Sequence, residues 1–334
     1  MVEDASNMDT ARRPSRIGSV EPGESLRDSV SIEIMPPLKG QGAGTLVEFL
    51  EGLGDWRPRF VSVTYHQAEQ MEVTSPEGEM RRITRRKKPG SLGICSMIRD
   101  RFDLEVLPHV ICGGFSRLDS EDYLIDLDYV GMRTLLVIRG DGQMGGPFRP
   151  ATGGHEHAVD LVEQIMALNR GEYVEEVAEP ATTAFRVGVG AYPEVHAEAR
   201  DLEHDLETLA RKERAGASFA ITQMFFDNDA YFDFVEAARG VGITMPIIPG
   251  LKVVTRRSHV ERLPEIFSIR MPPALVEAVA SCADDEEVRS IGIDHTLAQA
   301  SELHQSGVPG VHLFTMNDLD TTKRVVAGLQ GGIA

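Results

Sequence analysis

The stretch Ser31-Ile32-Glu33-Ile34-Met35-Pro36-Pro37 places a single carboxylate inside an apolar, β-branched run that two prolines close. This pattern predicts a short strand ending at the prolines, because proline lacks the amide hydrogen that a sheet requires. The face of the strand that carries Glu33 must therefore accommodate a carboxyl group. The simple alternative is a first strand whose glutamate points to solvent, and this stretch alone leaves both open.

Length and composition are those of a globular protein. The chain has 334 residues, 42% of them hydrophobic and 26% charged, and this length fits an α/β barrel counted as one domain. The net charge of -18 argues against nucleic acid or an anionic membrane surface as the main partner. No apolar run approaches the roughly 20 residues that span a bilayer.

The cysteines and the N-terminal segment indicate the compartment and the domain limits. Cys95, Cys112 and Cys282 show no metal-ligand spacing, so free thiols in a reducing cytoplasm are the simplest interpretation. Residues 1–30 are polar and lack the apolar core of a signal peptide. We expect residues 1–30 to form a disordered extension and residues 31–334 to form one folded domain.

Strand-like and helix-like runs alternate along the rest of the chain. After the Glu33 strand, we expect strands at residues 59–65, 104–112, 134–138, 185–192, 219–223, 245–251 and 310–315. We expect helices at residues 45–53, 91–102, 120–130, 157–169, 199–215 and 231–240, and further helical segments up to residue 304. Eight alternating strands predict an α/β fold, the single-domain TIM (β/α)8 barrel. A doubly wound sheet is the competitor, but it usually needs a Gly-x-Gly-x-x-Gly turn after its first strand, and none is present.

One polar segment interrupts this alternation. Residues 69–88 include the basic run Arg81-Arg82-Ile83-Thr84-Arg85-Arg86-Lys87-Lys88. A solvated loop or hairpin is the simpler interpretation, and a ligand site is the alternative.

Polar residues gather at the ends of the predicted strands, where the active sites of barrel enzymes lie. They are Glu33, Thr64, Tyr65, His109, Arg139, Gly140, Asp141, Tyr192, His196 and Gln223. The sequence offers no defensible Ser-His-Asp order, no His-Glu-x-x-His motif and no P-loop. No histidine pair has i, i+4 spacing beside a carboxylate, so we expect no metal site. The set is typical of a site that binds a bulky ligand through many polar edges.

An ordered set of short motifs resembles the methylenetetrahydrofolate reductase family. From about residue 31 to residue 330, the matching stretches are Glu33-Ile34-Met35-Pro36-Pro37, Val61-Ser62-Val63-Thr64-Tyr65, Pro108-His109, Ile138-Arg139-Gly140-Asp141, Ala191-Tyr192-Pro193-Glu194-Val195-His196, Ala215-Gly216-Ala217, Ile221-Thr222-Gln223, Phe225-Phe226-Asp227, Ile248-Pro249-Gly250 and Thr315-Met316-Asn317. Any one of these stretches alone would be weak, whereas the set in family order is specific.

The resemblance implies a flavoprotein reductase of one-carbon and methionine metabolism. Bound FAD would be reduced by NADH or NADPH and would then transfer a hydride from N5 to 5,10-methylenetetrahydrofolate, giving 5-methyltetrahydrofolate in a ping-pong reaction. Glu33 matches the acid that protonates the departing nitrogen as the substrate ring opens, a role that suits a raised pKa. Asp141 matches the carboxylate beside the flavin and the pterin, and Gln223 the amide that contacts the pterin. On geometry alone, Asp141 could instead cap a helix and Gln223 could be a strand-end residue without a ligand.

The resemblance also assigns the remaining positions. FAD would contact Thr64, Tyr65, His109, Arg139, Gly140, Asp141, His157, Ala158, Tyr192, His196, Asp205, Arg211 and Lys212. Arg211 and Lys212 could meet the pyrophosphate, with ordinary helix-surface charge as the alternative. His259 and Leu263 join Gln223 as substrate-binding positions.

The chain departs from the family pattern at four informative positions. His157 stands where many relatives have Tyr, and His259 where Gln is frequent. Leu263 replaces a Phe that stacks on the nicotinamide nucleotide in some bacterial members. Asp318 stands where Arg can meet the folate glutamate tail, and its charge would repel that carboxylate.

Three functional hypotheses follow. The first is a cytoplasmic, homo-oligomeric methylenetetrahydrofolate reductase. The second is a divergent member that uses another flavin, no flavin, or another electron donor. The third is a non-catalytic folate-binding barrel or a subunit of an electron-transfer complex, which the presence of Glu33, Asp141 and Gln223 disfavours.

Overall fold

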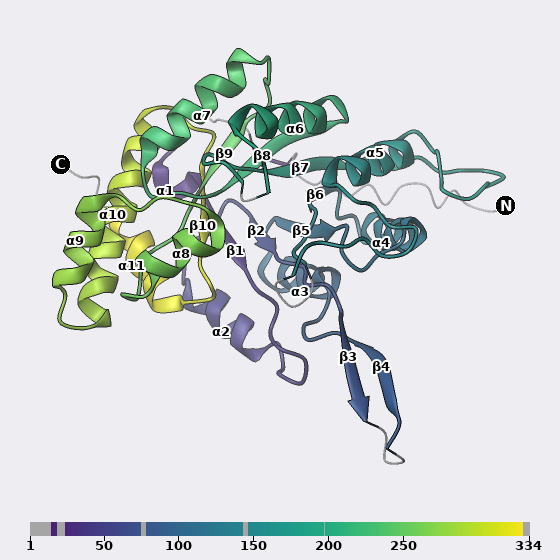
Figure 1. Ribbon diagram of the computed structural model, residues 1–334, viewed down its shortest axis with the longest axis horizontal. Helices are drawn as coiled ribbons and strands as arrows, with labels where there is room; N and C mark the ends of the chain where they lie inside the picture. Colours follow the sequence, from purple (N-terminus) through teal and green to yellow (C-terminus); the bar gives the residue numbers. More distant parts are fainter. Residues whose placement is uncertain (1–14, 19–23, 75–77, 143–145, 197, 330–334) are drawn as a thin grey trace.

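The computed structural model describes residues 15–18, 24–74, 78–142, 146–196 and 198–329. Within these residues, eight parallel strands close into a barrel and helices surround it (Figure 1). The order around the barrel is β1 (Val30–Ile34), β10 (Val311–Phe314), β9 (Ile247–Leu251), β8 (Ala217–Met224), β7 (Arg186–Ala191), β6 (Thr134–Ile138), β5 (Val106–Ile111) and β2 (Val61–Val63). The predicted TIM barrel is confirmed, and the doubly wound sheet is excluded.

Helices alternate with the barrel strands as predicted, and two helices outside the predicted set lie before β1 and after β10. They are α1 (Leu26–Ser29), α2 (Gly44–Gly52), α3 (Ser91–Phe102), α4 (Arg117–Tyr129), α5 (Ala158–Asn169), α6 (Leu202–Arg214), α7 (Asn228–Gly240), α8 (His259–Phe267), α9 (Pro273–Ser281), α10 (Asp285–Gln305) and α11 (Leu319–Gly328). Helix α4 begins three residues before the predicted start. The Ser116 hydroxyl accepts a hydrogen bond from the Asp119 amide, and the Asp119 carboxylate accepts one from the Ser116 amide. This capping box satisfies amides that the first helical turn leaves unpaired.

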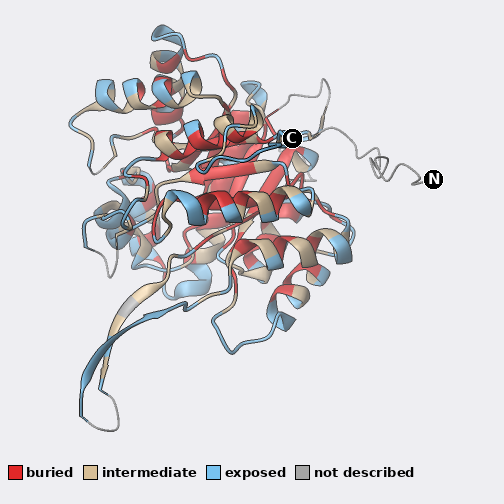
Figure 2. Cartoon of the chain, turned by 90° about the vertical axis from the view of Figure 1, so that its right-hand side faces the viewer, coloured by how far each residue is buried: buried red, intermediate tan, exposed pale blue. Residues whose placement is uncertain are grey.

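The polar segment before α3 is an antiparallel hairpin of β3 (Glu69–Thr74) and β4 (Met80–Arg85). It extends away from the barrel, and every residue of β4 is exposed (Figures 1 and 2). The hairpin interpretation of this segment is confirmed.

The barrel interior changes from apolar to polar along its axis. At the N-terminal ends of the strands, a fully buried cluster contains Ile17, Phe60, Leu107, Leu136, Phe219, Ile221 and Ile248. Gly188 makes room for this cluster, since a Cβ there would lie 2.2 Å from the Phe219 ring. One level higher, His312 contacts the Ser31 hydroxyl at 2.8 Å and the Ser62 hydroxyl at 3.2 Å. The polar level therefore lies toward the C-terminal ends, where the strand-end residues gather.

The N-terminal segment is only partly described, and its described part is packed. Ile17 has no exposed surface and closes the N-terminal end of the barrel. Arg59 donates from Nε to the carbonyl of Arg16 at 3.2 Å and forms an ion pair with Glu24 at 2.9 Å. The predicted disordered extension over residues 1–30 is therefore wrong at residues 15–18 and 24–30. Residues 1–14 and 19–23 lie outside the described part of the chain.

Candidate active site

Glu33 points into the C-terminal mouth of the barrel rather than to bulk solvent. Its side chain is 18% exposed, and Oε2 lies 3.6 Å from His109 Nε2. Burial raises the pKa of Glu33 to about 7, while the ammonium groups of Lys252 and Lys88 act in the opposite direction. A carboxyl group that is half protonated near neutral pH suits proton donation.

His109, on β5, is buried, and neither ring nitrogen has a hydrogen-bond partner among the described residues. Burial lowers its pKa to about 3, so the ring is neutral at pH 7. Buried polar atoms are nearly always paired in native proteins. An unpaired imidazole at the mouth of the barrel therefore indicates a position where a ligand atom can complete the contact.

The end of β6 carries the Arg139-Gly140-Asp141 turn. Gly140 adopts φ 86°, a conformation that other residues disfavour, and so the turn requires glycine here. Arg139 forms an ion pair with Glu198 at 2.5 Å and lies over the Phe148 ring at 4.9 Å. The Asp141 side chain is exposed, and its carbonyl accepts a hydrogen bond from Gln67 Nε2 at 2.6 Å. Because the next helix, α5, begins only at residue 158, Asp141 does not cap it.

The residues after β7 form a polar wall with α6. The rings of Tyr192 and His196 pack edge to face at 4.4 Å, and the His196 amide donates to the Asp205 carboxylate at 2.8 Å. Lys212 donates to the carbonyl of Gly190 at 3.0 Å, and burial lowers its pKa to about 8. Lys212 thus reaches a strand end and is not ordinary helix-surface charge, whereas the Arg211 side chain is exposed.

His157 and Ala158 lie where α5 begins. The His157 amide donates to Asp160 at 3.0 Å, and its side chain is exposed, while Ala158 is buried. His157 is close enough to Glu198 to lower the pKa of that carboxyl group, although the main cause is the hydrogen bond from Arg139. The positions after β6, before α5 and after β7 are thereby linked through Glu198.

The structure gives different surroundings to Thr64 and Tyr65, the two residues after β2. Thr64 contacts His66 Nε2 at 3.2 Å, and His66 in turn contacts Lys88 Nζ at 3.0 Å. Tyr65 points to the other side of the strand, where its ring packs edge to face against Phe115 and Tyr123. Thr64 therefore lies beside His66 and Tyr65 beside two aromatic rings, because successive residues of an extended segment face opposite sides.

The three expected substrate-binding residues, Gln223, His259 and Leu263, lie on β8 and α8 and are partly or fully buried. Gln223 is partly buried, and its Oε1 accepts a hydrogen bond from the amide of Met224 at 2.9 Å. His259 Nδ1 accepts one from the amide of Thr255 at 3.3 Å, and burial, with Lys252 next, lowers its pKa to about 4. Leu263 is 7% exposed and belongs to an apolar cluster with Phe226 and Ile269. The structure therefore places Leu263 in packed core and not on an open surface.

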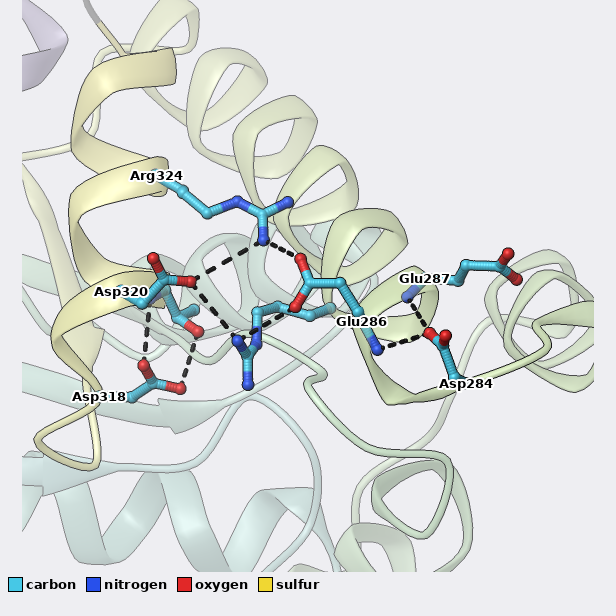
Figure 3. Close-up of polar contacts among 8 residues, drawn as sticks. Asp284, Glu286, Glu287, Asp318, Asp320 and Arg324 are labelled. Atoms are coloured by element: carbon cyan, nitrogen blue, oxygen red, sulfur yellow. Dashed lines mark hydrogen bonds and ion pairs between the residues drawn. The ribbon is translucent and has the colours of Figure 1, made fainter.

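Asp318 has a local structural role. It is the N-cap of α11, and its two carboxylate oxygens accept hydrogen bonds from the amide of Thr321 at 3.1 Å and from its hydroxyl at 2.8 Å (Figure 3). Beside it, Arg324 links Asp320 on α11 to Glu286 on α10. The departure from the family pattern at Asp318 thus stabilises the start of a helix.

Sequence reasoning missed two cations of the site, Lys88 after β4 and Lys252 after β9. Lys88 belongs to the basic run for which a solvated loop or hairpin is the simpler interpretation and a ligand site the alternative, and Lys252 follows directly on the strand predicted to end at residue 251. The inward alternation of Ile248 and Gly250 was the signal that could have placed Lys252 in the barrel interior.

A closed β/α barrel with titratable groups gathered at the C-terminal ends of its strands defines a barrel enzyme. A profile described as methylenetetrahydrofolate reductase matches residues 22–330, and the 5,10-methylenetetrahydrofolate reductase of Escherichia coli is 32% identical over 293 residues, covering 86% of each chain. The chain therefore belongs to the methylenetetrahydrofolate reductase family.

More distant relatives agree in family and fold. Methylenetetrahydrofolate reductase 1 of Schizosaccharomyces pombe is 27% identical over 301 residues, covering 90% of this chain and 45% of the relative. A Clostridium thermocellum protein described as binding two copies of 5-methyl-5,6,7,8-tetrahydrofolic acid superposes with a TM-score of 0.53 at 12% identity, covering 91% of this chain and 96% of its own. At that identity, the superposition supports the barrel fold alone.

Proposed function

We propose that this chain reduces 5,10-methylenetetrahydrofolate to 5-methyltetrahydrofolate with electrons from NADH or NADPH, in a ping-pong reaction through FAD. The observation that carries the proposal is Glu33, a mostly buried carboxyl group with a pKa of about 7 at the mouth of a family barrel. Relatives from rice and Caenorhabditis elegans are named as probable NADH and NADPH enzymes respectively, which supports a nicotinamide reductant of either kind.

The residues present fit a flavin. The unpaired nitrogens of His109 offer polar contacts, Tyr192 supplies a flat ring, and Lys212 supplies a cation. His109, Arg139, Gly140, Tyr192, His196 and Lys212 would hold the cofactor, with Thr64, Tyr65, Asp141, His157, Ala158, Asp205 and Arg211 around it. FAD, when bound, would accept a hydride from the nicotinamide nucleotide and deliver it to the folate.

The chain's own groups supply binding and proton transfer. Gln223 offers an amide donor and acceptor to the edge of the pterin, and Asp141 an acceptor. Glu33 would donate its proton to the ring nitrogen that departs from the bridging methylene carbon: its O–H bond breaks, the C–N bond breaks, and an N–H bond forms. Burial of Glu33 raises the pKa of its carboxyl group and so the fraction of molecules that carry the proton when substrate arrives.

The visible spectrum of the purified protein is the first test. We expect flavin bands near roughly 380 and 450 nm, bleaching with NADH or NADPH and recovering on addition of 5,10-methylenetetrahydrofolate. A colourless protein that FAD cannot reconstitute would overturn the cofactor assignment and favour the divergent member. Bleaching without recovery would favour a subunit of an electron-transfer complex.

We further propose a homo-oligomer that works in the cytoplasm. A two-stranded hairpin is marginally stable by itself, yet β3–β4 extends from the barrel with Met80 67% and Ile83 43% exposed. Its basic strand β4 is complementary to a second copy of a chain with net charge -18. Light scattering should give a multiple of the 36.6 kDa chain, and replacing Met80 and Ile83 by Ser should reduce the mass.

Three buried free cysteines are consistent with a reducing compartment. None of the helices within the described residues is long and apolar enough to cross a membrane.

A further inference from the structure

Lys252 has an unusual position for a lysine. It lies directly after β9 and is 7% exposed. No hydrogen bond or ion pair holds its ammonium group within the described part of the chain, although burial of an unpaired charge costs several kcal/mol or more. The charged side chains that act on it electrostatically are Glu33 and Asp318, and both oxygens of Asp318 already accept hydrogen bonds from Thr321.

The strand register brings Lys252 and Glu33 to the same level of the barrel. Leu251 on β9 pairs with Leu313 on β10, so Lys252 comes level with Phe314, and Phe314 pairs with Glu33 on β1. Side chains at one level of neighbouring parallel strands face the same side. Both charged groups therefore face the interior, with one strand between them.

Phe314 does not separate the two groups. Its ring occupies the space beside Gly250, since a Cβ on Gly250 would lie 2.7 Å from Phe314 Cε2. Gly250 lies two residues before Lys252, so the ring fills the level below. The electrostatic action of the Lys252 ammonium group on the Glu33 carboxyl group agrees with this arrangement.

We propose that Lys252 is a positioning residue of the active site, whose ammonium group stabilises the Glu33 carboxylate that remains after Glu33 has given its proton to the substrate. The inference rests on the proposed function, in which Glu33 is the proton donor. Before the transfer Glu33 is neutral and needs no counter-charge, and afterwards it is a buried anion. The attraction therefore develops during the step, which is where an interaction increases the rate.

Other charged groups face Glu33 and must be considered. His109 on β5 approaches it to 3.6 Å but is neutral, because burial lowers its pKa to about 3. Lys88 also acts on Glu33, but it is less buried than Lys252 and contacts His66 at 3.0 Å. Lys252 itself faces Asp318 and His259 as well as Glu33, and burial lowers its pKa to about 8, so it carries its charge at neutral pH.

The test is the pH dependence of the folate half-reaction in Lys252→Met and Lys252→Arg. Its rate is measured by stopped-flow as the reoxidation of the reduced protein. Removing a nearby opposite charge raises the pKa of a carboxyl group by about 1 or more. In Lys252→Met we expect the basic limb of the rate profile to move to higher pH by about one unit, with a rate loss of up to about tenfold because Glu33 becomes a weaker acid. Lys252→Arg should keep the wild-type limb, and the nicotinamide half-reaction should be unchanged in both variants. Lys39→Met, which removes an exposed cation, is the matched control.

A second measurement does not depend on catalysis. Glu33→Gln is made both in the wild type and in Lys252→Met, and the free energy of unfolding is compared with and without it across a range of pH. This difference reports the protonation of Glu33. The pH at its midpoint should be higher in the Lys252→Met background than in the wild type. Lys252→Gln replaces Lys252→Met if the latter does not fold. Unchanged midpoints in both measurements would overturn the role of Lys252. If the wild type shows no folate half-reaction while the stability midpoint moves, the proposed function fails but the charge coupling stands.

Discussion

The two ends of the barrel treat buried polar groups in opposite ways. At the N-terminal end, Arg59 is 8% exposed but is satisfied by Glu24 and by the carbonyl of Arg16, and Ile17 closes the end with no exposed surface. At the C-terminal end, both nitrogens of His109 lack partners within the described residues, and the pKa of Glu33 is raised to about 7. Paired buried groups contribute to a stable closure, whereas unpaired ones are retained where a ligand completes them. The molecule therefore divides stability and chemistry between two ends of one sheet.

The largest effect is expected from Glu33→Gln at the C-terminal end. Glutamine keeps the shape and removes the transferable proton, so the folate half-reaction should fall by about 10²–10⁴-fold. FAD binding and reduction by the nicotinamide nucleotide should persist, because neither step uses this proton. Stopped-flow measurement separates the two half-reactions. Normal reoxidation by 5,10-methylenetetrahydrofolate in the variant would remove Glu33 from the role of acid.

Ile17→Ala tests the opposite end. Truncating this fully buried residue should lower the free energy of unfolding by about 2–5 kcal/mol, measured by urea denaturation, with turnover per folded molecule unchanged. Val241→Ala, at a position 56% exposed, is the matched control and should change stability by less than about 0.5 kcal/mol.

Two N-terminal truncations test whether Ile17 closes the N-terminal end of the barrel. The sequence of residues 1–14 is polar and predicts that their removal changes neither melting temperature nor turnover, whereas removal through residue 18 should destabilise. Equal melting temperatures for the two truncated chains would show that Ile17 does not close the barrel.

The raised pKa of Glu33 at the C-terminal end of the barrel should make the free energy of unfolding depend on pH. The pKa of Glu33 is about 7 in the folded state against an ordinary value of 4.5, so its contribution is fully present below pH 4.5 and is lost as pH rises through 7. The glutamine side chain of Glu33→Gln does not titrate. The free energy of unfolding of this variant should therefore rise relative to the wild type as the pH increases from 4.5 to 7, and the gain should reach about 3 kcal/mol at pH 8. Thermal unfolding of both proteins from pH 5 to pH 8 measures the gain. The same substitution at the exposed Glu48 is the matched control.

The smallest predicted effect concerns Asp141→Asn. The proposed function places Asp141 beside the flavin, so removing its negative charge should raise the midpoint potential by ~30 mV, equivalent to ~1.4 kcal/mol in a two-electron couple. Reduction by the nicotinamide nucleotide should be no slower, while folate affinity and folate reduction should fall. A dye-equilibrated redox titration paired with folate binding measures both. Unchanged potential and unchanged affinity would place Asp141 outside the site.

Much of this arrangement could be predicted because it depends on short-range patterns. The apolar run at residues 134–138 and the amphipathic run at residues 91–102 gave a strand and a helix with the predicted limits. Strand ends carry the functional groups of a β/α barrel, so the positions of Glu33, His109 and Arg139 followed from the same patterns. The ring contacts of Tyr65 with Phe115 and Tyr123 did not follow from these patterns, because they depend on how distant segments pack.

Other features could not be predicted because their signals are weak in one dimension. Ile17 is a lone apolar residue in a polar segment, and only the open end of the barrel gives it a place to be buried. Leu263 matched a ligand position in the family pattern, yet the packing of α8 encloses it.

The sequence by itself determined the alternation of strands and helices, the strand-end position of Glu33, and the motifs that mark the family. Only the tertiary structure decided which groups surround Glu33, since Lys252 after β9, Lys88 after β4 and His109 on β5 are far from it along the chain. The physical reason is that the affinity of a carboxyl group for a proton depends on its burial and on nearby charges, and closure of the barrel sets both. Residue types fix which groups can titrate, and the closed barrel fixes the pH at which they do.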